Sequence, residues 1–351
     1  MNEEPTPLEA IVKAEIATSG PMTIHRYMEL CLGHPEHGFY KHHDPFGPEG
    51  DFTTAPEISQ MFGEMLGAWV ATVWHGMGRP DFRLIELGPG RGTLMADMLR
   101  VLQPAGAVPE VWLVDTSPLL KAEQSRRVPG ANWASSLAEV PTGPQIIVAN
   151  EFFDALPVHQ FFFGPEGARE HLMGLDADGE LLPGFSAAAP NATVHALDWQ
   201  EWSPLGDLVA DQIAERLRDG NAAFLAIDYG YTAADRPVGP SLQALRANRQ
   251  VQITDQPGRT DLTFLVDFDG LATRLAPLRS WVTGQGPFLV DLGIGHRAES
   301  LVRSEPKNAG AISDAFDVLT APEEMGTLFK VLAAVSEGVA PPPGFGEGPR
   351  A

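Results

Sequence analysis

The sequence is poor in cysteine, in basic residues and in long apolar runs. Its single cysteine, Cys31, cannot form an internal disulfide or build a cysteine-based zinc site alone, which fits a reducing compartment. The 24 Lys and Arg residues face 46 Asp and Glu residues, a formal net charge of -22 that disfavours nucleic acid or an anionic membrane as main partner. No window approaches the roughly 18 uncharged apolar residues of a membrane span, and the N-terminus lacks the basic and apolar regions of a signal peptide. We therefore expect a cytoplasmic protein without membrane insertion.

The composition and length indicate a folded chain with a substantial core. Hydrophobic residues make up 44% and charged residues 20%, close to globular averages, so disorder along the whole chain is excluded. The length of 351 residues predicts about two domains, or one large domain with insertions. We expect an N-terminal helical and loop cap at residues 1–78 and a core in two parts, at residues 79–159 and 216–337. A β-rich insertion at residues 160–215 separates the two parts of the core, and residues 338–351 form a disordered tail.

Short apolar runs and helical stretches alternate after the Gly- and Pro-containing breaker at residues 76–80. The strands are predicted at residues 83–87, 111–114, 132–134, 145–149, 222–227, 287–290 and 328–335. Such alternation is typical of an α/β fold with a parallel, doubly wound sheet and helices on both faces.

The strongest local motif is a glycine turn between a buried strand and a helix. It reads Gly88-Pro89-Gly90-Arg91-Gly92-Thr93, and glycines together with the free N–H groups of a helix N-terminus suit a nucleotide-type cofactor. Thr93 occupies the place of the third glycine of a dinucleotide fingerprint, which favours S-adenosyl-L-methionine over NAD or FAD. Pro89 and Thr93 are predicted to contact the cofactor together with the glycines.

Acidic residues end this strand and the next one. Glu86 would face a cationic ligand and repel a pyrophosphate, and Asp115, followed by Thr116, could accept hydrogen bonds from both ribose hydroxyls. The alternative is an ordinary tight turn in which Glu86 and Asp115 are solvated charges at strand ends.

The strand at 145–149 ends in a second polar motif, from Asn150 to Pro157. In an open α/β sheet the ligands meet beyond the carboxyl ends of the strands, so Asn150, Glu151 and Asp154 would face the methyl donor and suit a cationic acceptor. An Asn-Pro-Pro-aromatic motif would indicate methylation of nucleic-acid bases, but Glu151 and Phe152 replace both prolines. For Glu151 and Asp154, capping of a following helix remains open.

Four histidines invite a metal site but do not support one. His34, His37, His42 and His43 lie in a Gly- and Pro-rich loop without carboxylates at helical offsets, so we expect no metal. They are more readily placed near a substrate entrance.

Three long segments together resemble the MidA-like family of class I methyltransferases that depend on S-adenosyl-L-methionine. They are residues 47–64 around Gly50-Asp51-Phe52-Thr53-Thr54-Ala55-Pro56-Glu57, residues 86–93 and residues 150–157, with shorter matches at 261–268 and 325–330. The resemblance extends over about residues 20–335. It implies a seven-stranded, mostly parallel sheet whose last strand is antiparallel, with an N-terminal helical region and inserted segments over the active site.

The resemblance also implies roles for individual residues. Glu86, Gly88 and Gly90 would hold the methionine end of the cofactor and Asp115 its ribose. The loop of Asp51, Phe52 and Thr53 would close over the cofactor, while Asn150 and Glu151 would face the acceptor. The sequence departs from the family pattern at Pro240 and Asn248, where family members carry Gly-Asp-Thr-Leu-Gln-Ala and then a histidine, and this departure could change the acceptor.

A mitochondrial member of this family dimethylates an arginine of a respiratory complex I subunit during assembly. The resemblance therefore implies a protein-arginine N-methyltransferase whose partner is a protein with an accessible arginine. A non-catalytic assembly factor that binds the same cofactor, and a small-molecule methyltransferase, remain alternatives, and a homodimer is an open oligomeric state. Carboxylates at Glu151 and Asp154 would offset the repulsion between a guanidinium and the sulfonium.

Overall fold

The computed structural model describes residues 4–42, 54–189 and 198–346. The chain forms two compact units, each assembled from three segments. The first unit takes Met1–Phe52, Asp154–Asp207 and Asp235–Leu265, and the second takes Thr53–Phe153, Leu208–Ala234 and Val266–Ala351. The domain boundaries expected from the sequence, at residues 78, 159 and 215, divide the chain into consecutive segments. The compact units are interleaved instead, because the N-terminal helices pack with the inserted strands.

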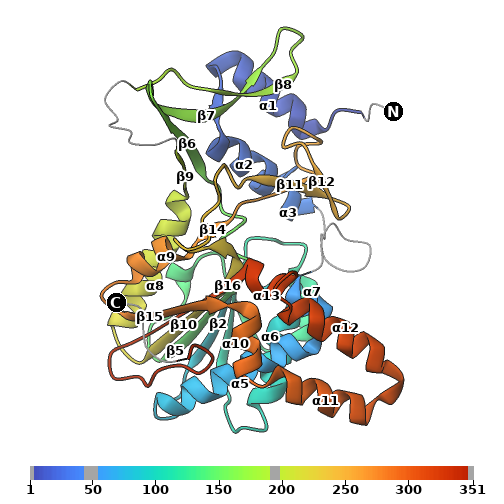
Figure 1. The fold of residues 1–351 in the computed structure, drawn as a ribbon, viewed down its shortest axis with the longest axis vertical. Helices are drawn as coiled ribbons and strands as arrows, with labels where there is room; N and C mark the ends of the chain where they lie inside the picture. The colour runs from blue at the N-terminus through green and yellow to red at the C-terminus, as the bar shows by residue number, and fades with distance from the viewer. Residues whose placement is uncertain (1–3, 43–53, 190–197, 347–351) are drawn as a thin grey trace. The chain divides into compact units, whose positions relative to one another are not determined.

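The second unit is built on a mixed sheet (Figure 1). Its strand order is β15-β16-β10-β5-β2-β3-β4, and β14 adds to β10. The strands span Arg279–Gly284, Phe329–Val335, Ala222–Tyr231, Gln145–Asn150, Arg83–Leu87, Glu110–Val114, Asn132–Ala134 and, for β14, Val266–Asp267. Strand β16 runs antiparallel to both β10 and β15, whereas β10, β5, β2, β3 and β4 are parallel. The α/β fold class, with a seven-stranded, mostly parallel sheet and an antiparallel last strand, is confirmed.

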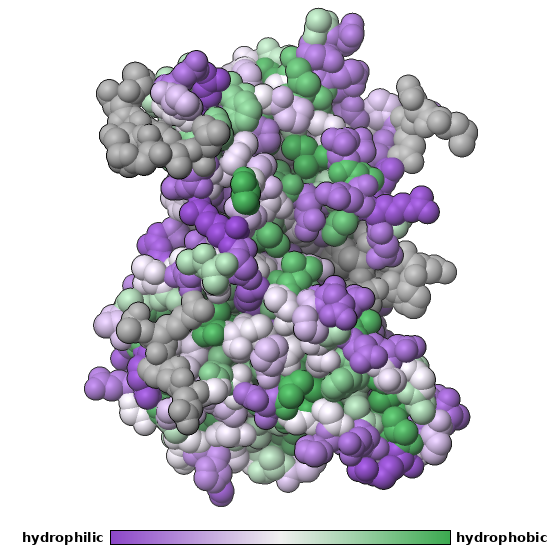
Figure 2. Space-filling model, in the orientation of Figure 1, coloured by the Kyte–Doolittle hydropathy of each residue, from purple (hydrophilic) through white to green (hydrophobic). Residues whose placement is uncertain are grey.

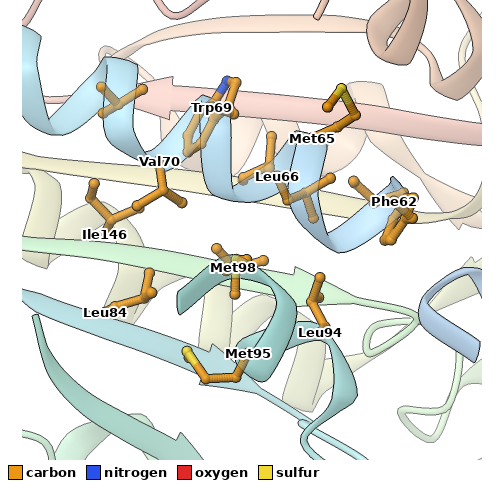
Figure 3. Close-up of a cluster of buried hydrophobic side chains, with 14 of the residues drawn as sticks. Phe62, Met65, Leu66, Trp69, Val70, Leu84, Leu94, Met95, Met98 and Ile146 are labelled. Atoms are coloured by element: carbon orange, nitrogen blue, oxygen red, sulfur yellow. The ribbon is translucent and has the colours of Figure 1, made fainter. Parts of the chain in front are cut away.

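The central strands are apolar on both faces because helices cover both. Alternate positions such as Leu84 and Ile146 pack against α5 (Gln60–Gly76) and α6 (Thr93–Leu102), as Figure 3 shows, while the intervening Ile85 and Ile147 are equally buried on the other face. Helices α8 (Pro204–Arg218) and α9 (Phe268–Leu275) lie on that second face in Figure 1. Burial on both faces explains why these strands read as continuous apolar runs.

Further helices complete the second unit. They are α4 (Ala55–Ile58), α7 (Lys121–Arg127), α10 (Gln285–Asp291), α11 (Ile294–Ser304), α12 (Ala309–Thr320) and α13 (Met325–Leu328). The strand predicted at 287–290 is wrong, because this segment forms α10, and the neighbouring strand is β15. A short apolar run does not distinguish a buried strand from a buried helix turn, and here Phe288 and Leu289 are buried from a helix.

Residues 338–346, the described part of the expected tail, pack against the second unit. Val339 is buried, and the ring of Phe345 packs on Phe288 with 5.3 Å between centroids. Apolar side chains within a Pro- and Gly-rich segment therefore fix the chain against α10.

The first unit joins N-terminal helices to antiparallel strands. Helices α1 (Pro7–Ser19), α2 (Ile24–Gly33) and α3 (Phe39–His42) share a core with two small sheets, ordered β1-β7-β6-β9 with β8 beside β7, and β12-β11-β13. These strands span Met22–Thr23, Gly167–Leu175, His159–Gly164, Asp198–Trp202, Leu181–Phe185, Arg249–Val251, Gln243–Arg246 and Asp261–Thr263. The segment predicted as a β-rich insertion, residues 160–215, contains β7, β8, β9 and nearly all of β6, together with most of helix α8 (Pro204–Arg218).

The surface visible in Figure 2 mixes hydrophilic residues with small, separate groups of hydrophobic ones. Hydropathy on this face therefore does not single out one docking surface. Among the described residues, no helix is both long and apolar enough to cross a membrane.

Candidate functional site

The glycine turn after β2 adopts backbone conformations that favour glycine. Gly88, Gly90 and Gly92 have φ of 64°, 50° and 80°, in the left-handed region. A Cβ on Gly88 would lie 3.0 Å from the Phe152 ring, and one on Gly92 3.4 Å from Val128. The turn thus passes close to Phe152 in the segment that follows β5. Two of the predicted motifs, the glycine turn and the segment that starts at Asn150, therefore lie next to each other.

Glu86 is the last residue but one of β2 and is 2% exposed. Burial raises the pKa of its carboxyl to about 8, the negative charge of Asp115 adds to the shift, and a hydrogen bond from the Met95 backbone opposes it. Its Oε2 has no hydrogen-bond partner among the described residues. A buried carboxylate oxygen without a partner is costly unless a ligand satisfies it.

Asp115 follows β3 and is held on both oxygens. Its Oδ1 accepts the Ser117 backbone N–H at 2.7 Å, and its Oδ2 accepts Nε2 of Gln124 at 2.7 Å. Each carboxylate oxygen can accept a further hydrogen bond, so ribose hydroxyls could still bind there.

The chain after β5 turns sharply at Glu151. Glu151 has φ of 50°, an uncommon conformation for a residue with a side chain and one often found at functional sites. Its Oε1 accepts the Ala55 backbone N–H at 3.1 Å and Nδ2 of Asn150 at 3.1 Å. With its amide oriented in this way, Asn150 leaves a buried Oδ1 with no partner among the described residues.

A buried carboxylate that the sequence reasoning missed supports this turn. Asp228, 1% exposed on β10, accepts the backbone N–H groups of Phe152 at 3.1 Å and Phe153 at 2.9 Å through Oδ2, and that of Tyr229 at 2.9 Å through Oδ1. It follows the strand predicted at 222–227 by one residue. The rule that polar groups gather at the carboxyl ends of parallel strands could have found it.

Thr93 directs its hydroxyl into a different network. The hydroxyl donates to Glu57 Oε1 at 2.6 Å and accepts Nη1 of Arg127 at 2.9 Å. A cofactor contact at Thr93, as predicted, would therefore use the backbone N–H at the start of α6.

The remaining predicted residues are placed as follows. The Pro89 carbonyl accepts the Gly92 N–H at 2.7 Å within the turn, and Thr116 is exposed beside Asp115. Asp154 belongs to the first unit, where it is buried and its carbonyl accepts the Phe264 N–H at 3.2 Å. Asp51, Phe52 and Thr53 lie outside the described residues.

The segment that departs from the family pattern forms part of the first unit. Ser241 donates its N–H to Glu201 Oε1 at 2.9 Å, and its hydroxyl bonds the same carboxylate. Asn248, with φ of 58°, occupies the turn between β11 and β12, where asparagine tolerates a left-handed conformation. Turn geometry thus accommodates Asn248, and hydrogen bonds to Glu201 hold Ser241, the residue after Pro240.

Within residues 4–42, 54–189 and 198–346, no group of three or more His, Cys, Asp or Glu side chains is arranged to hold a metal ion. The rings of His34 and His37 stack with 5.4 Å between centroids.

The arrangement in the second unit fits a charged nucleoside. Glu86 and Asn150 each have an oxygen that lacks a partner among the described residues and can accept a hydrogen bond. Asp115 can accept hydroxyls, and the N-cap of α6 is Gly92, which provides no side-chain cap. The left-handed glycines bring the backbone close to any ligand in the turn. A ligand with an amino group, a carboxylate and a ribose would satisfy all these groups.

Comparison with known proteins supports this fit. The sequence profile of a family described as "Putative S-adenosyl-L-methionine-dependent methyltransferase" matches residues 65–283. A crystal structure of a Burkholderia thailandensis protein bound to S-adenosyl-homocysteine superposes with a TM-score of 0.87 and 26% identity, covering 100% of this chain and 99% of that one.

Two curated relatives are similar over most of their length. The protein arginine methyltransferase NDUFAF7 of Rattus norvegicus is 34% identical, over 93% of this chain and 84% of its own. That of Homo sapiens is 32% identical, over 93% and 83%. The resemblance to the MidA-like family and the predicted cofactor are confirmed: the chain belongs to the family of S-adenosyl-L-methionine-dependent methyltransferases that includes the mitochondrial NDUFAF7 proteins.

Proposed function

We propose that the protein transfers a methyl group to an arginine nitrogen of a protein acceptor. The observation that carries the proposal is the turn after β5, where the strained Glu151 holds the Asn150 amide with Oδ1 buried and unpartnered among the described residues. A hydrogen-bond acceptor beside a carboxylate suits a cationic N–H group. The names of the curated relatives support arginine as the acceptor side chain.

In this proposal the glycine turn and two acids hold the cofactor. Glu86 binds its amino group, the turn at Gly88 and Gly90 admits its methionine end, and Asp115 binds its ribose. When bound, S-adenosyl-L-methionine supplies an electrophilic methyl group. Burial of Glu86 excludes water from its carboxylate, which strengthens its attraction for a cation.

The acceptor residues act by position and charge. A guanidinium stays charged in proteins, so the site must offset repulsion between two cations and align a nitrogen lone pair. Asn150 Oδ1 accepts a guanidinium N–H, and the Glu151 carboxylate stabilises the positive charge and receives the proton that leaves the nitrogen. We include Asp154 as a second acid of the acceptor side, on the basis of its position in the sequence motif after β5.

Labelling of an acceptor tests the proposal. The purified protein is incubated with S-adenosyl-L-methionine carrying a labelled methyl group and a lysate from a strain lacking the gene, and labelled species are identified by mass spectrometry. A subunit of respiratory complex I is the acceptor that the family resemblance implies and the first to inspect. We expect methylated arginine in a protein, at a level that falls with Glu151→Gln.

Three results would contradict the proposal. Label on lysine or on another protein side chain would refute arginine as the acceptor. Label confined to a small molecule would refute a protein acceptor. Binding of the cofactor without transfer to any lysate component would indicate an assembly factor that uses the cofactor as a ligand.

A further inference from the structure

Gln124 on α7 is a fully buried amide in the second unit. Its Nε2 donates to the Gly90 carbonyl at 2.8 Å and to Asp115 Oδ2 at 2.7 Å. Its Oε1 accepts Nε1 of Trp133 at 2.9 Å. The side chain therefore links the glycine turn after β2 to the acid after β3.

The chemistry of the partners fixes the orientation of this amide. An indole N–H only donates, so Oε1 must face Trp133, and both hydrogens of Nε2 must face Gly90 and Asp115. Nζ of Lys121 lies over the Trp133 ring, 5.2 Å from its centroid. The alternative flip would oppose Oε1 to two acceptors, which a buried site does not tolerate.

We propose that Gln124 is a positioning residue that aims the Asp115 carboxylate at the cofactor ribose and ties it to the glycine turn. The inference rests on the proposed cofactor site. Asp115 carries the ribose contact, while Gln124 acts through it and touches no cofactor atom. With Ser117 on Oδ1 and Gln124 on Oδ2, the carboxylate is held at both oxygens, so ribose binding does not have to freeze its rotation.

Removing the amide should weaken cofactor binding through Asp115. In Gln124→Met the side chain keeps its length but loses both donors, so Asp115 Oδ2 and the Gly90 carbonyl lose a buried partner. In Gln124→Glu the shape is kept, but a carboxylate opposes Asp115 and cannot donate. We expect S-adenosyl-homocysteine to bind about tenfold more weakly to the first variant, and more weakly still to the second.

A matched control separates this effect from the loss of any buried amide. Gln285 on α10 is also fully buried in the second unit, and its Nε2 donates to the Leu319 carbonyl at 2.9 Å. Gln285→Met removes a buried amide outside the site. We expect its affinity for S-adenosyl-homocysteine to stay within about twofold of the parent protein.

Calorimetry with two ligands and two backgrounds gives the decisive readout. The ligands are S-adenosyl-homocysteine and its 2′,3′-dideoxy analogue, which offers Asp115 no hydroxyl. We expect Gln124→Met to weaken the first ligand about tenfold but the second less than threefold. In an Asp115→Asn background, adding Gln124→Met should change the affinity for S-adenosyl-homocysteine less than threefold, because the two residues act as one unit.

The outcomes separate this inference from the cofactor site itself. Equal weakening of both ligands by Gln124→Met, or full additivity with Asp115→Asn, overturns the positioning role. Parent-like binding by both Gln124 variants does the same. If Asp115→Asn alone leaves S-adenosyl-homocysteine binding unchanged, the proposed ribose contact fails, and the inference fails with it.

Discussion

The two sides of the candidate site are built on different principles. On the cofactor side, the glycine turn and Asp115 lie within about one strand-helix-strand repeat, and Gln124 from the following helix joins them. On the acceptor side, the turn at Glu151 depends on groups far away in the sequence, namely the Ala55 N–H and the Asp228 carboxylate.

The difference separates what is encoded locally from what needs the folded sheet. Glycines adopt left-handed conformations at little steric cost, so the cofactor turn needs little outside support. Glu151 adopts its left-handed conformation only at a steric cost, because it carries a side chain. A strained backbone of this kind persists only where the surrounding structure fixes it. Substitution of Glu151 or of the group that supports its turn should therefore affect transfer or stability, whereas substitution of an acid that contacts the cofactor should affect affinity.

The largest effect is expected at Glu151. Glu151→Gln keeps the shape but removes the charge, and we expect the methyl-transfer rate to fall about 100-fold, as for loss of one electrostatic group at a reacting centre. S-adenosyl-homocysteine affinity should stay within about threefold, since the cofactor contacts lie elsewhere. Single-turnover transfer and calorimetry measure the two. A parent-like rate would remove Glu151 from the chemistry.

The next effect tests the support of the strained turn. Asp228→Ala leaves three backbone N–H groups without their carboxylate, and we expect the free energy of unfolding to fall by about 3 kcal/mol. Urea unfolding measures it, with the exposed Asp198, which pairs with Arg236 at 3.3 Å, as a control: Asp198→Ala should cost about 0.5 kcal/mol or less. Equal losses in the two variants would show that the turn does not depend on Asp228.

Glu86 should give a smaller effect, on affinity and on its pH dependence. Glu86→Gln should weaken cofactor binding about tenfold, because a cation loses its buried carboxylate. In the parent protein, binding should tighten as pH rises towards about 8, where the Glu86 carboxyl, whose pKa is about 8, ionises. The variant should lack this gain when binding is measured from pH 6 to 9.

The Glu86 carboxyl also affects folding stability, in the direction opposite to its effect on cofactor affinity: stability falls as pH rises. Its pKa is raised from 4.5 to about 8 by folding, so the stability it contributes is present below pH 4.5 and is lost as pH rises to about 8. Without cofactor, Glu86→Gln should therefore gain in Tm relative to the parent as pH rises from 5 to 8. A constant Tm difference across this range would argue against a buried, neutral Glu86.

The smallest effect is expected at Thr93, whose hydroxyl serves Glu57 and Arg127. Thr93→Val should lower the free energy of unfolding by about 1 kcal/mol and leave cofactor affinity within about twofold. Thermal unfolding and calorimetry measure these quantities. A larger loss of affinity would mean that the hydroxyl itself contacts the cofactor.

Sequence reasoning could propose the cofactor side because its signals are local. The acids at Glu86 and Asp115 and the turn between them follow directly from strand ends and glycine spacing. Gln124 was missed because a glutamine on a polar helix carries no pattern that distinguishes a buried bridge from an exposed residue. The segment at 287–290 was misread because an apolar run of four residues fits either kind of element.

The sequence by itself determined the family and most of the parallel strands, and it singled out the glycine turn that we propose receives the cofactor, since hydrophobic period, glycine spacing and charge are properties of neighbouring residues. Only the tertiary structure decided that β16 inserts between β10 and β15. It also decided that Asp228 and Ala55 meet the turn at Glu151. These contacts join residues more than 70 positions apart, and such pairings form only when the sheet brings its strand ends together.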